Sequence, residues 1–167
     1  LVAYTAPSPV SYLRLGPHHW SCGFASFGIQ NREAAIRICP APSPDPQAQS
    51  KGFNLEYRPV DATASPYMVV GALIQAGLDG VDRQLPLPAR CDVDPADLSE
   101  AQRAELGIVA LPSTLDEALR ALSINEVARS WMSETMYTAY TDLKKTEIEI
   151  AASQSPDEMC SRHTNAY

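Results

Sequence analysis

The apolar pattern of this chain changes near residue 60, and this change constrains its fold more than any other feature of the sequence. Before it, apolar and polar side chains alternate with the two-residue period of β-strands. After it, apolar residues recur at helical spacing. We therefore predict an α+β fold, with antiparallel strands in the first ~60 residues and packed helices after them.

The strand-patterned part is expected to contain a β-hairpin followed by a long loop. Trp20–Ile38 has two apolar arms, and Gly28–Asn31 supply a turn between them. Prolines then cluster in Pro40–Pro46, and polar residues continue to Ser50. Since proline fixes φ and removes a backbone donor, we expect this segment to be an extended surface loop.

One further strand is predicted after the loop, and its two faces differ in polarity. Successive side chains of a strand point to opposite faces. The apolar face holds Phe53, Leu55 and Tyr57, and the polar face holds Asn54, Glu56 and Arg58. A face with opposite charges so close together either lies in water or lines a site.

Helices are predicted for the rest of the chain. The first starts at Ser65–Pro66, an N-cap followed by proline. From Tyr67 to about Leu78 its only strongly polar side chain is Gln75, so we expect this helix to be buried nearly all round.

The later helices are recognised by capping residues and spacing. They are expected at Ser99–Gly107, from Ser113 or Thr114 onward, from about Ser133 to Ala152, and within Pro156–Tyr167. The helix at Ser99 has a capping box with Gln102. The long helix places Met136, Tyr140 and Leu143 on one stripe.

The composition indicates a soluble globular domain. The 167 residues are enough for one ordinary domain, with 45% apolar and 20% charged residues. The net charge of −7 argues against a general nucleic-acid binder. The longest apolar run, Met68–Ile74, is too short to span a membrane. The 4 cysteines lie far apart, so we expect no disulfide framework, no zinc site and a cytoplasmic location.

Charged residues near the predicted strands are the best candidates for chemistry. They are Arg14, Arg32, Arg37, Lys51, Glu56 and Arg58. Arginine binds carboxylate and phosphate in a bidentate manner, so such a set suits an anionic nucleotide with its metal ion. Ordinary surface ion pairs are the alternative for each residue. His18 and His19 could be read as metal ligands, but adjacent strand side chains point apart and a polar loop is favoured.

Six segments resemble the glutamine synthetase catalytic domain, in order and with compatible spacing. They are Ser11–Pro17 (SYLRLGP), Asn31–Arg37 (NREAAIR), Leu55–Arg58 (LEYR), Asp61–Tyr67 (DATASPY), Ala72–Gly80 and Leu115–Leu122. The joint match is specific, although no single motif is. The resemblance implies part of a glutamine synthetase/guanido kinase-like catalytic domain, and ATP-dependent joining of the γ-carboxylate of glutamate to an amine.

The resemblance also implies roles for the charged candidates in binding substrates. Arg14 and Arg58 would hold the carboxylates of glutamate or a similar amino acid. Arg32 and Lys51 would contact the phosphates of ATP.

Two further residues would act on the transferred phosphoryl group. Arg37 would stabilise it in flight, and Glu56 would bind a Mg²⁺ or Mn²⁺ ion. ATP would phosphorylate the substrate carboxylate, and an amine would then attack the acyl phosphate. Phosphoryl transfer depends mainly on positioning and charge neutralisation, which this set could supply.

Trp20 departs from the family pattern. Glutamine synthetases carry a glutamate six residues after the arginine that matches Arg14, and that glutamate helps to deprotonate ammonium. An indole ring cannot act as this base, so the resemblance implies an organic amine, as in γ-glutamyl-amine ligases. Two alternatives stay open: a true glutamine synthetase that uses ammonia, and a non-catalytic homologue with a role in assembly or regulation. The second alternative, a non-catalytic homologue, is disfavoured because the chain keeps all the charged candidate residues.

The chain is expected to be one portion of a longer enzyme. It begins at Leu1 without methionine. The N-terminal β-grasp domain, the E-x-E metal motif and the nucleotide-binding histidine segment of the family are not among its residues. We therefore expect residues 1–167 to be the C-terminal portion of the catalytic domain and inactive alone, and the full-length protein to form a homo-oligomeric ring.

Overall fold

The computed structural model describes residues 1–164, and the chain divides into two compact units. The sheet unit comprises residues 15–59 and 86–111. The helical unit comprises residues 1–14, 60–85 and those from 112 onward. A small sheet and a larger set of helices confirm the predicted α+β class.

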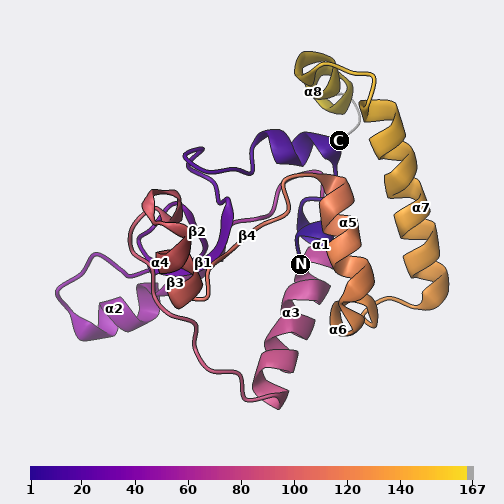
Figure 1. The fold of residues 1–167 in the computed structure, drawn as a ribbon. Helices are drawn as coiled ribbons and strands as arrows, with labels where there is room; N and C mark the ends of the chain where they lie inside the picture. Colours follow the sequence, from indigo (N-terminus) through magenta and orange to yellow (C-terminus); the bar gives the residue numbers. More distant parts are fainter. Residues whose placement is uncertain (165–167) are drawn as a thin grey trace. The chain divides into compact units, whose positions relative to one another are not determined.

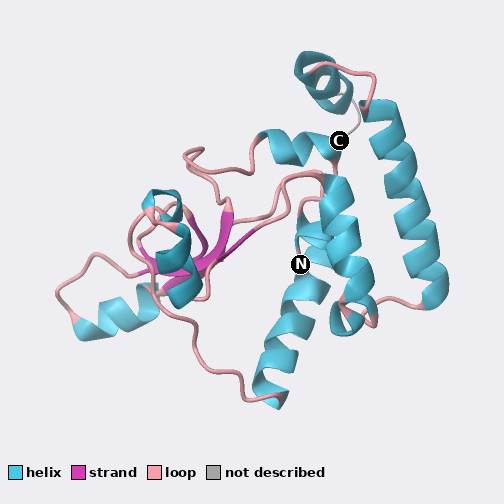
Figure 2. Ribbon diagram, in the orientation of Figure 1, coloured by secondary structure: helices cyan, strands magenta, loops and turns pink. Residues whose placement is uncertain are grey.

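The sheet unit is built on a four-stranded sheet in the order β3-β2-β1-β4 (Figures 1 and 2). The strands are β1 (Phe24–Ile29), β2 (Ala34–Cys39), β3 (Asn54–Tyr57) and β4 (Val109–Ala110). β2 and β3 are antiparallel, and their register places Arg37 opposite Glu56. β3 confirms the strand predicted after the loop, whereas nothing in the sequence pattern indicated β4.

The predicted hairpin is wrong, because β1 and β2 pair in parallel, with Phe24 opposite Ala34 and Ile29 opposite Ile38. Only the segment 30–33 connects them, much shorter than the roughly dozen residues usual for parallel strands. Two features turn the chain within this connection. Gln30 has a φ of 55°, and the side-chain amide of Asn31 donates to the carbonyls of Cys91 and Val93, both at 2.9 Å.

Short helices complete the sheet unit: α2 (Pro46–Gly52), the 3-10 helix η2 (Pro95–Asp97) and α4 (Glu100–Glu105). The proline-rich loop is therefore shorter than predicted, because Asp45 accepts the Gln47 N–H at 3.0 Å and caps α2. α4 confirms the prediction of a capping box between Ser99 and Gln102. Its end at Gly107 is also confirmed, since this glycine has a φ of 67°.

The helical unit contains α1 (Val2–Thr5), the 3-10 helix η1 (Pro9–Leu13), α3 (Pro66–Asp82), α5 (Leu115–Ile124), α6 (Glu126–Arg129), α7 (Glu134–Ala151) and α8 (Pro156–Thr164). The starts predicted for α5 and α7 are confirmed by their N-caps, Thr114 and Ser133. α8 confirms the last predicted helix as far as Thr164, and residues 165–167 lie outside the described part.

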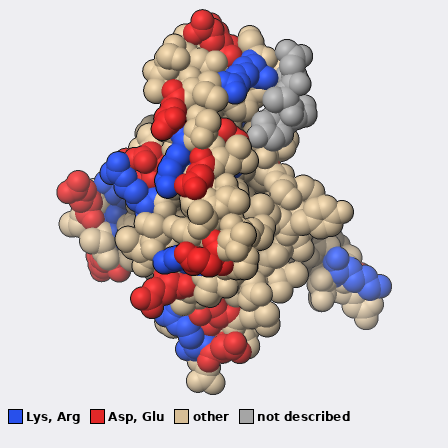
Figure 3. Space-filling view, turned by 90° about the vertical axis from the view of Figure 1, so that its right-hand side faces the viewer, with Lys and Arg blue, Asp and Glu red and all other residues tan. Residues whose placement is uncertain are grey.

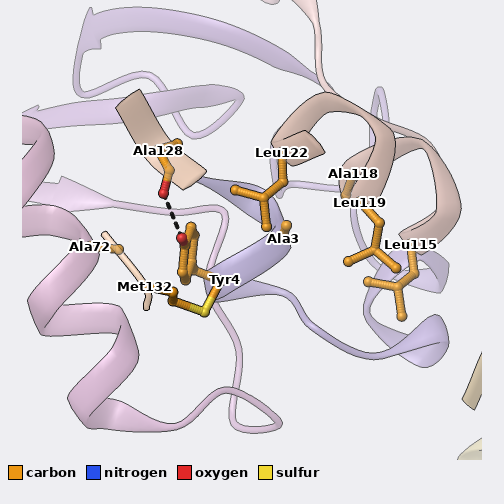
Figure 4. Close-up of a cluster of buried hydrophobic side chains, with 9 residues drawn as sticks. All are labelled: Ala3, Tyr4, Ala72, Leu115, Ala118, Leu119, Leu122, Ala128 and Met132. Carbon is orange, nitrogen blue, oxygen red and sulfur yellow. Dashed lines mark hydrogen bonds between the residues drawn. The ribbon is translucent and has the colours of Figure 1, made fainter. Parts of the chain in front are cut away.

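The core of the helical unit forms around Tyr4 and one face of α5 (Figure 4). Leu115, Leu119 and Leu122 share that face because they are three or four residues apart. The Tyr4 hydroxyl donates to the carbonyl of Ala128 at 2.6 Å. Burial raises the pKa of Tyr4 to about 12, so the hydroxyl keeps the proton that it donates.

The expectation that α3 is buried nearly all round is wrong. Ala72 is the one buried residue of α3, and five of its apolar side chains form an exposed stripe: Tyr67, Val70, Ile74, Leu78 and Val81. In α7 the buried residues are Thr141 and Lys144, while Met136 and Leu143 are exposed. Apolar spacing identified these helices, but the neighbours within the unit decide which face is covered.

Charges of both signs are interspersed on the face drawn in Figure 3. Among the described residues, ion pairs between neighbours in sequence include Arg83 with Asp79 and Lys145 with Asp142. All four cysteines are free. No helix among residues 1–164 is long and apolar enough to cross a lipid bilayer.

Candidate functional site

A charged cluster lies where β2 and β3 pair. Because Arg37 stands opposite Glu56 in the antiparallel register, its guanidinium reaches the Glu56 carboxylate and forms an ion pair through Nη2 and Oε2. Arg58, two residues after Glu56 on the same face, reaches the other oxygen, with 2.8 Å between Nη1 and Oε1. One carboxylate therefore joins two guanidinium groups.

This polar face is more buried than the apolar face of β3. The side chains of Arg58 and Arg37 are 12% and 21% exposed, whereas Leu55 is 60% exposed as a residue. Ordinary surface ion pairs lie in water, where each contributes about 0–1 kcal/mol. The surface-pair interpretation therefore does not describe Arg37 and Arg58.

Both arginines also keep a buried donor without an acceptor. Within the described chain, the Nε atoms of Arg37 and Arg58 have no hydrogen-bond partner. A buried donor left unpaired costs roughly 1–3 kcal/mol. A carboxylate or phosphate oxygen would satisfy such donors, so the cluster is suited to an anionic ligand.

Trp20 connects this cluster to the start of β2 through its backbone. Its carbonyl accepts from Arg58 Nη2 at 2.7 Å, and its N–H donates to Glu33 Oε1 at 2.8 Å. The Arg32 guanidinium lies over the indole, 5.2 Å from the ring centroid. Trp20 is still 70% exposed as a residue, so its side chain is accessible to a ligand.

The structure thus brings four of the six predicted residues into one connected network: Arg32, Arg37, Glu56 and Arg58. Lys51 lies in the last turn of α2 and is exposed. Arg14 belongs to the helical unit, where its Nη2 donates to the carbonyl of Val60 at 3.0 Å.

Sequence reasoning missed Glu33. Its partner is a backbone N–H 13 positions away, which no side-chain motif shows. The available signal was a carboxylate between Arg32 and the start of β2, inside a motif already singled out for its arginines.

His18 lies on the polar loop predicted for it, but the structure gives it acidic neighbours. Its Nδ1 is 2.9 Å from Asp94 Oδ2, and one ligand atom from each of His18, Asp94 and Asp97 lies within 4.8 Å of the others. The Asp94 side chain also accepts the Ala96 N–H and so caps η2. These contacts account for Asp94 without a metal ion.

The donor set fits a nucleotide better than it fits a complete metal site. The paired arginines can neutralise phosphate, and their unpartnered Nε atoms can donate to its oxygens. Glu56 is a suitable ligand for Mg²⁺ or Mn²⁺, but Mg²⁺ takes about six oxygen ligands in octahedral geometry. Glu56 would therefore be one ligand, with phosphate oxygens, water or other residues completing the set.

Comparison with known proteins places these motifs in a family. A family model described as "Glutamine synthetase, catalytic domain" matches residues 1–162. The chain is 40% identical over 139 residues to the gamma-glutamylpolyamine synthetase GlnA3 of Streptomyces coelicolor, covering 83% of this chain and 29% of that protein. It is 39% identical over 151 residues to a glutamine synthetase of Sulfolobus acidocaldarius, and the match covers 90% of this chain and 31% of that protein.

A solved structure agrees with these sequence matches. A protein described as a novel glutamine synthase homolog superposes with a TM-score of 0.80 at 38% identity, covering 99% of this chain and 35% of that one. The chain therefore spans about a third of the length of the proteins that it matches.

Proposed function

Since this chain belongs to the glutamine synthetase catalytic-domain family, we propose that the full protein is an ATP-dependent ligase that joins the γ-carboxylate of glutamate to an amine. The observation that carries this proposal is the Arg37–Glu56–Arg58 cluster, with its two buried and unpaired Nε donors. In this proposal residues 1–167 form the C-terminal portion of the catalytic domain.

Within this function, Arg37 and Glu56 serve the phosphoryl group. The γ-carboxylate of glutamate attacks the terminal phosphorus of ATP, ADP leaves, and an acyl phosphate forms. Arg37 neutralises negative charge that develops on the transferred group. Glu56 holds a Mg²⁺ or Mn²⁺ ion, which supplies further charge neutralisation when bound.

The remaining predicted residues bind the two substrates. Arg58 and Arg14 hold the carboxylates of glutamate, and Arg32 and Lys51 contact the phosphates of ATP. Burial favours Arg58 for a carboxylate, because a guanidinium removed from water binds anions more strongly.

We propose an organic amine, such as a polyamine, ethanolamine or an alkylamine, as the second substrate. The exposed indole of Trp20 offers an apolar face, and cation–π attraction to an alkylammonium contributes roughly 0.5–2 kcal/mol. A relative at 40% identity is named as a gamma-glutamylpolyamine synthetase. Ammonia is the competing nucleophile, because a relative at 39% identity is named as a glutamine synthetase.

A panel of nucleophiles tests this choice in the full protein. kcat/KM is measured for ammonium, ethanolamine, an alkylamine and a polyamine, each with glutamate and MgATP. We expect an organic amine to exceed ammonium, and Trp20→Ala to reduce kcat/KM for that amine more than for ammonium. Ammonium as the best substrate by a wide margin contradicts the role given to Trp20.

A further inference from the structure

Glu33 has one carboxylate oxygen that the fold does not use. Its Oε1 accepts the Trp20 N–H, whereas Oε2 is buried and has no hydrogen-bond partner among the described residues. The backbone of Glu33 is fixed at the same time, because its N–H donates to Asn31 Oδ1 at 2.9 Å. A carboxylate held this firmly, with an unpaired oxygen removed from water, is suited to a cationic donor.

Glu33 belongs to the same network as the proposed phosphoryl-transfer residues. Trp20 donates to Glu33 through its N–H and accepts from Arg58 through its carbonyl, and Arg58 in turn contacts Glu56. The two hydrogen bonds and one residue of backbone place the Glu33 carboxylate at most about 9 Å from the Arg58 guanidinium. This distance is comparable to the length of one small substrate molecule.

Glu56 cannot serve the amine in the same way. Its two oxygens pair with Arg37 and Arg58, and the same carboxylate is the proposed ligand of the metal ion. An alkylamine arrives mainly as an ammonium ion at neutral pH, and it must lose a proton before its nitrogen can attack. Of the two carboxylates connected to the Trp20 backbone, Glu33 is the one with an oxygen that has no hydrogen-bond partner among the described residues, so it is better placed to accept that proton.

We propose that Glu33 is the carboxylate that binds the ammonium group of the amine substrate and accepts its proton. This proposal rests on the proposed function and adds to it the group that activates the nucleophile. One proton passes from nitrogen to Glu33 Oε2, and the freed electron pair forms the C–N bond at the acyl carbon. The C–O bond to phosphate breaks, its electron pair leaves with phosphate, and a second proton from nitrogen goes to that phosphate. The third proton stays on the amide.

The loop that carries Trp20 lies against Glu33 through the Trp20 N–H, and the amine needs access to the buried Oε2 beside it. His18 and Trp20 have φ values of 61° and 54°, a sparsely populated region for residues with side chains. Within the loop, the Gly16 N–H contacts Ser21 Oγ at a long 3.4 Å. Movement of this loop would release backbone strain, but it would also break the contacts of Trp20 with Glu33 and Arg58 and the contact of His18 with Asp94.

Glu33→Gln in the full protein tests this role. The amide oxygen can still accept from the Trp20 N–H, but it cannot take a proton. With an alkylamine or polyamine we expect kcat to fall roughly 10²–10⁴-fold. The KM values for glutamate and ATP should stay within a fewfold of the wild type. Glu105→Gln, an exposed change on α4 of the same unit, serves as the matched control.

Hydroxylamine separates proton acceptance from loop positioning. It is a neutral nucleophile at pH 7 and needs no base, so Glu33→Gln should form the hydroxamate at close to the wild-type rate. Unchanged alkylamine kinetics in Glu33→Gln overturn the proposal, as does an equal loss with hydroxylamine, which indicates a structural role alone. A wild-type protein that joins no nucleophile to glutamate rejects the proposed function and this inference with it.

Discussion

At the residue scale, the chemistry of this chain centres on Glu56. Its carboxylate joins Arg37 and Arg58, and both guanidinium groups are largely buried. Burying charge is unfavourable unless hydrogen bonding is complete, and here the two Nε donors have no partner within residues 1–164. Such a cluster is poorly explained by stability alone, and a bound anion would complete it.

Glu56→Ala tests the cluster in the full protein. Removing this carboxylate takes away a proposed metal ligand and leaves two arginines without their counter-charge. We expect kcat to fall by at least about 100-fold with glutamate, MgATP and the best amine. Steady-state kinetics provide the measurement, with Glu105→Ala as the control. A rate within a fewfold of wild type would make Glu56 an ordinary surface carboxylate.

The sequence predicted that Glu56 and Arg58 share one face of a strand, but it did not predict which residues they contact. Glu56 and Arg58 share a strand face by simple alternation, and β3 confirms it. Their contact with Arg37 depends on the pairing register of β2 and β3. The alternation of side chains along one strand does not predict that register. Glu33 was missed because its partner is a backbone group.

At the scale of elements, helix starts were predictable and strand pairing was not. Capping is local: Ser99, Thr114 and Ser133 each accept the backbone N–H of the residue three positions later. Ser99 and Ser133 were predicted from the sequence, and Thr114 was one of two candidates with Ser113. The direction of β2 relative to β1 depends on tertiary contacts of the connection, including the Asn31 amide with Cys91 and Val93.

The cap of α5 gives a prediction of its own. Thr114 Oγ1 accepts the Glu117 N–H at 3.1 Å, so Thr114→Ala should destabilise the first turn of α5 by about 1 kcal/mol. Native-state hydrogen exchange should then show amides near Leu115 opening about fivefold faster. Ser123→Ala, on the exposed side of the same helix, should change little. Equal exchange in both variants would argue against this cap.

At the scale of the whole molecule, the predicted site residues are shared between two compact units. Arg14 lies in the helical unit, and the other five lie in the sheet unit. The exposed apolar stripe of α3 shows in addition that apolar composition alone did not predict burial within this chain. The matching proteins are about three times as long, so the proposed activity belongs to the full protein.

Oxygen transfer from glutamate to phosphate tests the central claim most directly. The full protein is incubated with MgATP, an amine and glutamate labelled with ¹⁸O in its γ-carboxylate, and the products are analysed by mass spectrometry. If an acyl phosphate forms, each γ-glutamyl amide released is accompanied by one phosphate that carries one ¹⁸O atom. Phosphate without label, or ATP hydrolysis without amide, would contradict ligation through an acyl phosphate.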